Sequence, residues 1–189
     1  MLRNQFNINI ENVVASSDLH QNIDLESVAR TFPTVEYKPE QFPGLVYRLR
    51  KPTVATLVFS NGKFIVAGAK SEKRAKRAAL KLAEELTTGG IVILAKPDVR
   101  IRNVVGSADL GHQIDLEDAA NILEGTIYEP DQFPGLIYRM KEPRVVFLIF
   151  ASGRVVCTGA SREVDVRRAV DKLHEALAIR GLIPYCACE

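Results

Sequence analysis

The sequence is poor in the features that mark membrane, secreted and disulfide-stabilised proteins. Its 189 residues include no tryptophan, two methionines and three cysteines, and polar residues interrupt every long apolar run. No stretch approaches the roughly 20 apolar residues that span a bilayer, and the first ten residues lack the apolar segment of a signal peptide. We therefore expect a soluble, intracellular protein located in the cytoplasm, associated with the nucleoid if it acts on DNA.

The cysteines give no sign of a metal or redox centre. Cys157 lies in an apolar, strand-like run and is expected to be a small core residue. Cys186 and Cys188 are separated by a single residue near the chain end, whereas zinc sites usually need wider spacing and further ligands. We expect no metal, no cofactor and a short tail over residues 184–189.

The charge balance alone does not suggest a nucleic-acid partner. The formal net charge is +2 and the pI is about 8.4, below the value of roughly 9 that is typical of such domains. If this protein binds DNA, much of the binding energy must come from something other than phosphate neutralisation. The hydrophobic content of 47% is enough for a packed core.

The sequence contains two consecutive copies of a unit of about 90 residues, and the two copies align without an insertion. A shift of 91 residues aligns Ile10–Gly90 with Ile101–Gly181, and roughly 36 of the paired residues are identical. The strongest block is Tyr37–Arg48, matched by Tyr128–Arg139. We predict a first repeat over 1–92 and a second over 93–183. The joint at 92–96 is too short and too apolar for a flexible linker, so one rigid body is expected.

Periodicity predicts the same elements in each repeat. In the first we expect strands over 7–15, 44–50, 53–59 and 63–69, a short helix over 25–31 capped by Asp24, and a long helix over 71–86 capped by Ser71. Asp115 is the counterpart of Asp24. This order predicts an α+β unit in which two helices cover one face of a sheet.

The predicted strands are apolar on both faces. Alternation places Ala55, Leu57 and Phe59 opposite Val54, Thr56 and Val58; it also places Phe64, Val66 and Gly68 opposite Ile65 and Ala67. Two helices suffice for one face, so the other must be buried against something else. A homodimer, a sandwich interface and a binding surface are all compatible with that pattern. Strict alternation also puts Ile8 and Ile10 on the face of Asn12, which suggests a hidden bulge or twist.

Four phenylalanines recur at matched positions. Phe42 and Phe133 precede Pro-Gly in a loop, where proline keeps the preceding residue extended and glycine permits a tight turn. Phe59 and Phe150 close a strand just before a turn. Such paired apolar groups are what minor-groove proteins insert between base steps, although a single phenylalanine is more often a core residue.

Asn12 and Asn103 lie among valines, where an amide is costly unless it is hydrogen-bonded. A minor groove offers adenine N3 and thymine O2 as acceptors. A structural asparagine that bonds to backbone is the alternative for each residue.

No constellation of catalytic residues is present. His20, His112 and His174 do not map onto one another under the 91-residue shift, and no nucleophile lies in a recognisable elbow or triad. The repeated Asp18 and Asp109 fall at turns. We expect that the protein is not an enzyme.

The motifs EPDQFPGLIYRM, LIFASGR and NVVGSADL, from residues 129, 148 and 103 onward, resemble those of the TATA-box-binding proteins of the archaeal, core-only type. The resemblance covers residues 4–183. It implies a saddle of ten antiparallel strands with four helices on its convex face. It also implies a general transcription initiation factor that binds the minor groove of a TATA element on double-stranded DNA and recruits transcription factor B and RNA polymerase.

The resemblance assigns roles to individual residues. The intercalating residues would be Phe42, Phe59, Phe133 and Phe150. The minor-groove residues would be Asn12, Val14, Leu57, Ile65, Asn103, Val105, Leu148, Val156 and Thr158, although the counterpart of Thr158 is Ala67. The phosphate-contacting residues would be Arg48, Asn61, Lys63, Arg139, Ser152 and Arg154. The surface that docks transcription factor B would comprise Glu129, Asp131 and Gln132.

A protein-interaction scaffold that uses the apolar face is the alternative function, and the free protein could form a homodimer through that face. The basic stretch 70–81 falls on the covered side, either as a solvated helix face or as a partner site. Because the repeats are so similar, we expect nearly symmetric DNA binding, with polarity set by small differences or by a partner.

Overall fold

The computed structural model describes residues 6–184, which fall into two compact units. Asn12–Asn103 form the first unit, and the described residues up to Glu11 join those from Val104 onward in the second unit. The N-terminal strand therefore contributes to both units. The repeat boundaries at residues 92 and 93 follow the internal duplication and stay a prediction, while Cys186 and Cys188 lie outside the described residues.

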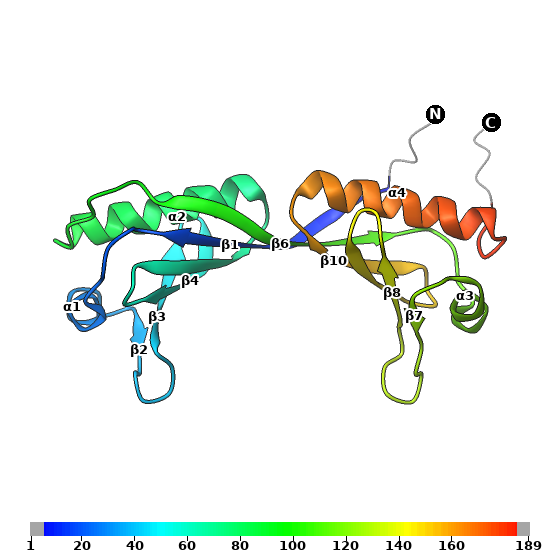
Figure 1. Cartoon of the computed structure of the whole chain (residues 1–189), viewed down its shortest axis with the longest axis horizontal. Coiled ribbons are helices and arrows are strands. Elements are labelled where there is room, and N and C mark those ends of the chain that lie inside the picture. The colour runs from blue at the N-terminus through cyan, green and yellow to red at the C-terminus, as the bar shows by residue number, and fades with distance from the viewer. Residues whose placement is uncertain (1–5, 185–189) are drawn as a thin grey trace. The chain divides into compact units, whose positions relative to one another are not determined.

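The two repeats have the same order of elements (Figure 1). The first contains β1 (Asn9–Asp18), α1 (Leu25–Thr31), β2 (Glu36–Tyr37), β3 (Gly44–Arg50), β4 (Thr53–Phe59), β5 (Lys63–Ala69) and α2 (Glu72–Thr88). The second contains β6 (Asp98–Asp109), α3 (Leu116–Ile122), β7 (Thr126–Ile127), β8 (Leu136–Met140), β9 (Val145–Ile149), β10 (Arg154–Ala160) and α4 (Glu163–Ile179). The strands of the first repeat follow the order β2-β3-β4-β5-β1, and those of the second follow β7-β8-β9-β10-β6. The predicted α+β class, with a ten-stranded antiparallel sheet and four helices, is confirmed.

Most of the predicted element limits agree with the structure. Strands β3, β4 and β5 and helix α1 have the predicted ends, and α2 extends two residues further, to Thr88. The predicted limits 7–15 of the first strand are wrong, because pairing with β5 continues as far as Asp18 and Lys63. Periodicity cannot reveal β2 and β7, since each has only two residues.

Side chains cap the starts of α1, α2 and α3. Hydrogen bonds from the Ser27 hydroxyl, and from backbone N–H groups of the first turn of α1, reach the carboxylate of Asp24 and lower its pKa. Asp115 accepts the equivalent backbone bonds at α3, and Ser71 caps α2. At the start of α4, Arg162 provides no side-chain cap. The predicted caps are therefore confirmed.

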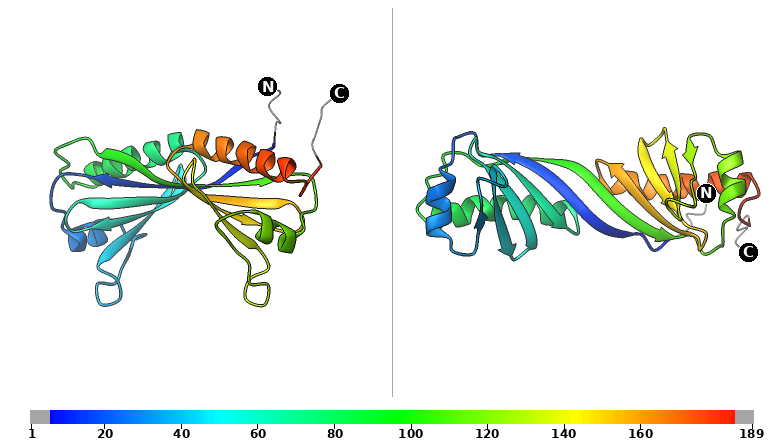
Figure 2. Two further views of the ribbon diagram at one scale, coloured as in Figure 1. Left: turned by 45° about the vertical axis from the view of Figure 1, so that its right-hand side comes forward. Right: turned by 90° about the horizontal axis from the view of Figure 1, so that it is seen from below.

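In each unit the long helix covers one face of the strands. Helix α2 lies along β5, and α4 lies along β10 (Figures 1 and 2). The side of α2 that meets the strands is apolar and buried: Ala75, Ala78, Ala79, Leu82 and Leu86. Lys73, Lys76 and Arg77 on its other side are exposed, so the basic stretch forms the outer surface of this helix. No helix within residues 6–184 combines the length and apolar character that crossing a membrane requires.

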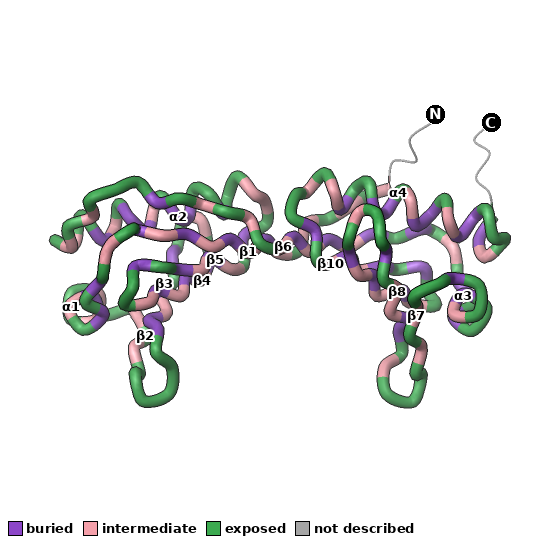
Figure 3. Tube along the Cα trace, viewed as in Figure 1, coloured by how far each residue is buried: buried purple, intermediate pink, exposed green. Residues whose placement is uncertain are grey.

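The opposite side of the strands, here called the open face, has no helix over it. Fully buried and half-buried residues alternate along β1, β4 and β9 (Figure 3). The fully buried residues lie on the helix side of the strands, and the half-buried ones belong to the open face. The half-buried positions in the first repeat include Asn12, Val14, Ala55, Leu57, Phe59, Ile65 and Ala67. Those in the second include Asn103, Val105, Val146, Leu148, Phe150, Val156 and Thr158. The predicted alternation in β4 is confirmed.

A β-bulge interrupts the alternation in β5. The register between β1 and β5 shifts on either side of Val14, so that Ala67 and Gly68 together oppose this one residue. Gly68 has a φ of +93°, which L side chains rarely adopt. The prediction that Gly68 shares the covered face is wrong, because the bulge leaves Gly68 exposed and turns Ala69 into the core. The register between β10 and β6 shifts at the corresponding place.

Strand β1 itself alternates without interruption. Ile10, Asn12 and Val14 are half-buried, whereas Val13 and Ala15 are fully buried. Ile10 and Asn12 therefore lie on the same face without any bulge in β1. The bulge suspected from the sequence lies in the partner strand, β5.

Several residues that the sequence assigns to the framework have that role. Cys157 is buried, and burial raises the pKa of its thiol to about 12, so the thiol stays protonated at neutral pH. The carboxylates of Asp18 and Asp109 close turns by accepting the backbone N–H groups of His20 (2.7 Å) and Gly111 (2.9 Å). These interactions account for the residues without any catalytic role.

A glutamine side chain holds the segment that joins the two repeats in sequence. Residues 91–97 have no regular secondary structure. The Gln21 amide donates to the carbonyl of Val92 at 2.6 Å and accepts from the N–H of Leu94 at 2.8 Å. This segment is thus fixed to the first unit, although Val92 and Leu94 are exposed.

We expect Asp24→Ala and Asp115→Ala each to lower the free energy of unfolding by about 1 kcal/mol, because each removes an N-cap. The loss should be larger at Asp24, which also accepts the Ser27 hydroxyl. Urea denaturation would measure both, with the exposed Glu124→Ala as a control that removes a charge but no cap. A loss at Asp115 no greater than at Glu124 would contradict the cap role of Asp115.

Candidate nucleic-acid interface

The open face is apolar and only partly shielded from water. Leu57, for example, is half-buried between Thr56 and Val58, which are both 0% exposed. The predicted apolar floor residues all lie at such half-buried positions: Val14, Leu57, Ile65, Val105, Leu148 and Val156. An antiparallel sheet with one face toward water normally carries polar residues there. This face therefore has the composition of a binding surface.

Each repeat brings two phenylalanine rings together beside the open face. The ring centroids of Phe42 and Phe59 lie 5.8 Å apart at an interplanar angle of 63°. Those of Phe133 and Phe150 lie 5.9 Å apart at 65°. This edge-to-face arrangement is a favourable one for aromatic rings. Because Phe42 remains 38% exposed, the pair is presented to solvent rather than enclosed in the core.

The Phe-Pro-Gly motif explains how the rings come so close to the strand. A Cβ atom on Gly44 would lie 2.7 Å from Cε1 of Phe42 and 3.0 Å from Cε1 of Phe59. Gly135 has equivalent contacts, at 2.7 Å and 3.1 Å, with the second pair of rings. Only glycine leaves room for both rings. The proline before it keeps each loop phenylalanine in an extended conformation.

The β-bulge orients the amide of Asn12. The N–H of Gly68 donates to Oδ1 of Asn12 at 2.9 Å. Because a backbone N–H must bond to the side-chain oxygen, the NH₂ group of Asn12 points away from this bond and keeps two donors. The two alternatives from the sequence are therefore combined, since Asn12 bonds to backbone and still offers donors on the open face. Asn103 lies at the equivalent half-buried position of β6.

The predicted phosphate-contacting residues are all exposed: Arg48, Asn61, Lys63, Arg139, Ser152 and Arg154. Arg48 pairs with Glu36 (Nε to Oε1, 3.1 Å). Such exposed pairs contribute about 0–1 kcal/mol, so a phosphate could displace this carboxylate at little cost. The side-chain oxygen of Asn61 accepts the backbone N–H of Lys63 at 3.1 Å and so holds the turn that presents the lysine.

The predicted partner-docking residues lie in the loop between β7 and β8. Glu129, Asp131 and Gln132 are exposed. The carbonyl of Glu129 accepts the N–H groups of Gln132 and Phe133 at 3.0 Å and 2.9 Å. One turn therefore positions Phe133, a predicted intercalating residue, and displays two acidic side chains.

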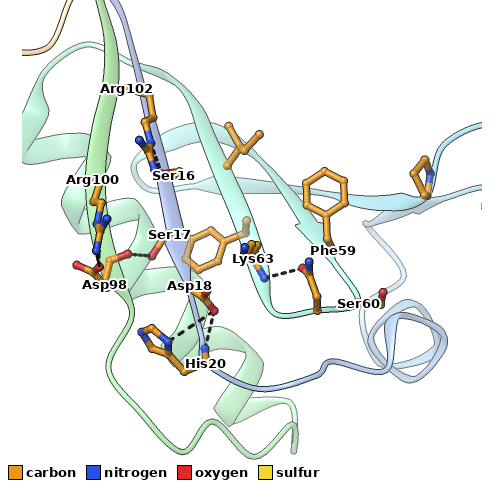
Figure 4. Close-up of a pocket in the computed structure, with 14 residues that line it drawn as sticks. Ser16, Ser17, Asp18, His20, Phe59, Ser60, Lys63, Asp98, Arg100 and Arg102 are labelled. Atoms are coloured by element: carbon orange, nitrogen blue, oxygen red, sulfur yellow. Dashed lines mark hydrogen bonds and ion pairs between the residues drawn. The ribbon is translucent and has the colours of Figure 1, made fainter.

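Two arginines of β6 lie beside the open face of the first repeat, although they are not among the site residues predicted from the sequence. Arg100 and Arg102 line a cavity of about 580 Å³ together with Phe59 and Ile65 of the open face (Figure 4). Exposed residues at alternate positions occur in any strand with one face toward solvent, so the spacing of Arg100 and Arg102 alone does not indicate a site. Comparison with the first repeat could have found them, because the counterpart of Arg102 is Glu11.

Comparisons with known proteins agree with this geometry. The family model described as transcription factor TFIID (or TATA-binding protein, TBP) matches the chain twice, over residues 7–88 and 98–179. The chain belongs to the TATA-binding protein family. The resemblance identified from the sequence motifs is thus confirmed, and the two matches correspond to the two repeats.

This chain is similar to several archaeal members of the family. The TATA-box-binding protein of Pyrodictium occultum is 54% identical over 177 residues, which cover 93% of this chain and 89% of the relative. That of Methanocaldococcus jannaschii is 49% identical over 170 residues, covering 90% and 93%. The solved structure of Methanococcus jannaschii TBP matches with a TM-score of 0.83 and 49% identity over 91% of this chain and 98% of that chain. The family comprises DNA-binding transcription factors rather than enzymes.

Proposed function

We propose that this chain is a general transcription initiation factor that binds the minor groove of a TATA element through its open face. The observation that carries the proposal is an uncovered apolar face flanked by a solvent-presented phenylalanine pair in each repeat. An enzyme site or a small-molecule pocket would need converging polar groups, whereas this face has mostly apolar side chains.

The chemistry of the open face fits the minor groove of A·T-rich DNA. That groove presents adenine N3 and thymine O2 as acceptors, and the NH₂ group of Asn12 supplies donors. Thr158 would add a hydroxyl on the second repeat, where Ala67 is its counterpart in the first. The apolar floor cannot read the donors and acceptors of the major groove. It can displace water from a widened minor groove and so favours easily deformed steps such as TA.

The phenylalanine pairs would act as wedges. Unstacking a base step costs a few kcal/mol, and fully burying a phenylalanine side chain contributes roughly 1.5–3 kcal/mol. Two rings per wedge therefore offset the cost of one opened step, even though each ring is already partly buried. The exposed cations beside the open face would then hold the backbone of the bent DNA, with Arg48 and Lys63 on the first repeat and Arg139 and Arg154 on the second.

Membership of this family also implies protein partners. We propose that Glu129, Asp131 and Gln132 dock transcription factor B, which in turn brings RNA polymerase to the promoter within the cytoplasm. The exposure and acidity of this loop support a protein partner, and the loop is fixed to the wedge by its turn. Off DNA, the open face could pair with a second copy of this chain.

A scaffold that binds only proteins through the open face is the rival function. A mobility-shift titration with TATA and scrambled duplexes of equal length separates the two. The proposed function requires preference for the TATA duplex, and equal affinity for both duplexes would refute it.

Phe59→Ala and Phe150→Ala should each weaken TATA binding roughly tenfold or more and reduce DNA bending, because one ring of a wedge is lost. Fluorescence resonance energy transfer across an end-labelled TATA duplex measures the bend. Leu94→Ala removes an exposed apolar side chain away from the strands and is the control. Thermal unfolding identifies any loss of fold. A folded variant that bends DNA as fully as the control would exclude the wedge role.

Asn12→Asp should reduce affinity at least about tenfold, because the carboxylate can still accept from Gly68 but offers no donor to the groove and repels phosphates. Asn121→Asp introduces the same charge on helix α3 and is the matched control. Fluorescence anisotropy with a TATA duplex measures both variants. Equal affinities for the two variants would mean that Asn12 is purely structural.

Glu129→Arg should leave TATA affinity unchanged and abolish the ternary complex with transcription factor B, because it reverses one charge of the docking loop. The equivalent loop of the first repeat provides the control Glu40→Arg, at the position matched to Asp131. The readout is the supershift of the DNA complex by added transcription factor B. An undiminished supershift with Glu129→Arg would rule out this docking surface.

A further inference from the structure

A cavity in the first unit joins the open face to a group of cationic side chains. It has a volume of about 580 Å³ and is lined by Phe59 and Ile65, by Lys63, and by Arg100 and Arg102 of β6 (Figure 4). Phe59 thus shares this cavity with Arg100 and Arg102, which belong neither to its own hairpin nor to the residues assigned to phosphate contact above. The cavity is open enough to admit a group from solvent.

Arg102 is held in place without being neutralised. Its Nε donates to the hydroxyl of Ser16 at 2.6 Å, which leaves both terminal nitrogens of the guanidinium group available. Within residues 6–184 no carboxylate forms an ion pair with Arg102. Arg100 pairs with the exposed Asp98 at 3.0 Å, a contact of the kind that solvent screens strongly.

The second unit contains the equivalent cavity with different charges. This cavity measures about 620 Å³ and is lined by Asn7, Asn9, Ser107, Phe150 and Arg154 among others. Under the 91-residue shift these residues correspond to Asp98, Arg100, Ser16, Phe59 and Lys63. The position of Arg100 is therefore neutral in the second cavity.

The most informative difference is at the serine. In the first unit the hydroxyl of Ser16 accepts from Arg102, whereas in the second the hydroxyl of Ser107 donates to Oε1 of Glu11 at 2.7 Å. Glu11 and Arg102 are counterparts under the shift. Ser16 and Ser107, which are counterparts, thus form hydrogen bonds with side chains of opposite charge.

The two cavities consequently differ in net charge. Lys63, Arg100 and Arg102 face the carboxylates of Asp18 and Asp98 around the first cavity, which leaves it with an excess of one positive charge. Around the second, Arg154 is balanced by Asp109, and the place of Arg102 is taken by the acidic Glu11 beside Ser107. A phosphate would find two guanidinium groups at the first cavity and neither of their counterparts at the second.

We propose that Arg102, assisted by Arg100, binds a backbone phosphate of DNA that lies on the open face, and that only the first repeat makes this contact. The inference rests on the proposed DNA binding. A guanidinium group suits a phosphate because its two terminal nitrogens can donate in parallel to two oxygens. Ser16 fixes the orientation of that group in advance, so little side-chain freedom is lost on binding. With this contact, the first repeat binds one more backbone phosphate than the second.

The test is the salt dependence of TATA binding by the full chain. Each phosphate contact contributes about −0.9 to the slope of log K against log salt concentration, so Arg102→Gln should make the slope shallower by about 1. Its affinity near 0.1 M salt should fall about three- to tenfold. Arg100→Asn, which introduces the residue of the second repeat, should have a smaller effect in the same direction. Lys73→Gln removes a cation from the outer side of α2 and should leave the slope unchanged.

A transplant provides the reverse test. Asn9→Arg combined with Glu11→Arg places counterparts of Arg100 and Arg102 in the second unit and should steepen the slope by about 1. If Arg102→Gln matches Lys73→Gln, or if the transplant leaves the slope unchanged, the assignment of Arg102 is overturned. Failure of the unmodified chain to prefer a TATA duplex would instead overturn the proposed function, so the two failures are distinguishable. Circular dichroism of each variant confirms that the fold is retained.

Discussion

Each repeat has enough helix to cover only one face of its strands, and the remaining properties of the molecule depend on this shortage. Helices α2 and α4 bury the alternate residues that face them, and the other residues of the same strands stay apolar but only half-buried. Exposed apolar area of this kind is unfavourable in water unless something covers it. A binding partner that covers this face relieves that cost, and the minor groove of A·T-rich DNA is the partner that we propose.

Local backbone features turn this apolar face into a specific one. The bulge at Gly68 removes one N–H from the sheet ladder, and this N–H fixes the Asn12 amide, so a structural irregularity orients a side-chain donor on the open face. The absence of a side chain at Gly44 allows two rings to pack beside the strand end. In both places the sequence departs from ideal strand composition where the site needs it, which is common at functional sites.

The sequence predicts the regular elements well because their signals are local. Alternation over seven residues locates β3, β4 and β5, and an acidic cap locates α1. The two-residue strands escape prediction because only pairing with β3 and β8 defines them. The bulge at Gly68 depends on register against β1, which no single strand reveals. The predicted wedge residues come together as pairs, yet their roles on DNA rest on the family rather than on periodicity.

Duplication alone would give two halves that hold DNA equally, and a symmetric clamp cannot distinguish the two directions along a promoter. The repeats agree best in the Phe-Pro-Gly motif, the strand-end phenylalanine and the asparagine, to which the proposed function assigns the groove and wedge contacts. They differ at Arg102 and Glu11, which contact equivalent serines with opposite charge. Identity is thus retained where the proposed function requires the same contact from both repeats. Charge has diverged beside the open face, where a difference between repeats could favour one direction of binding.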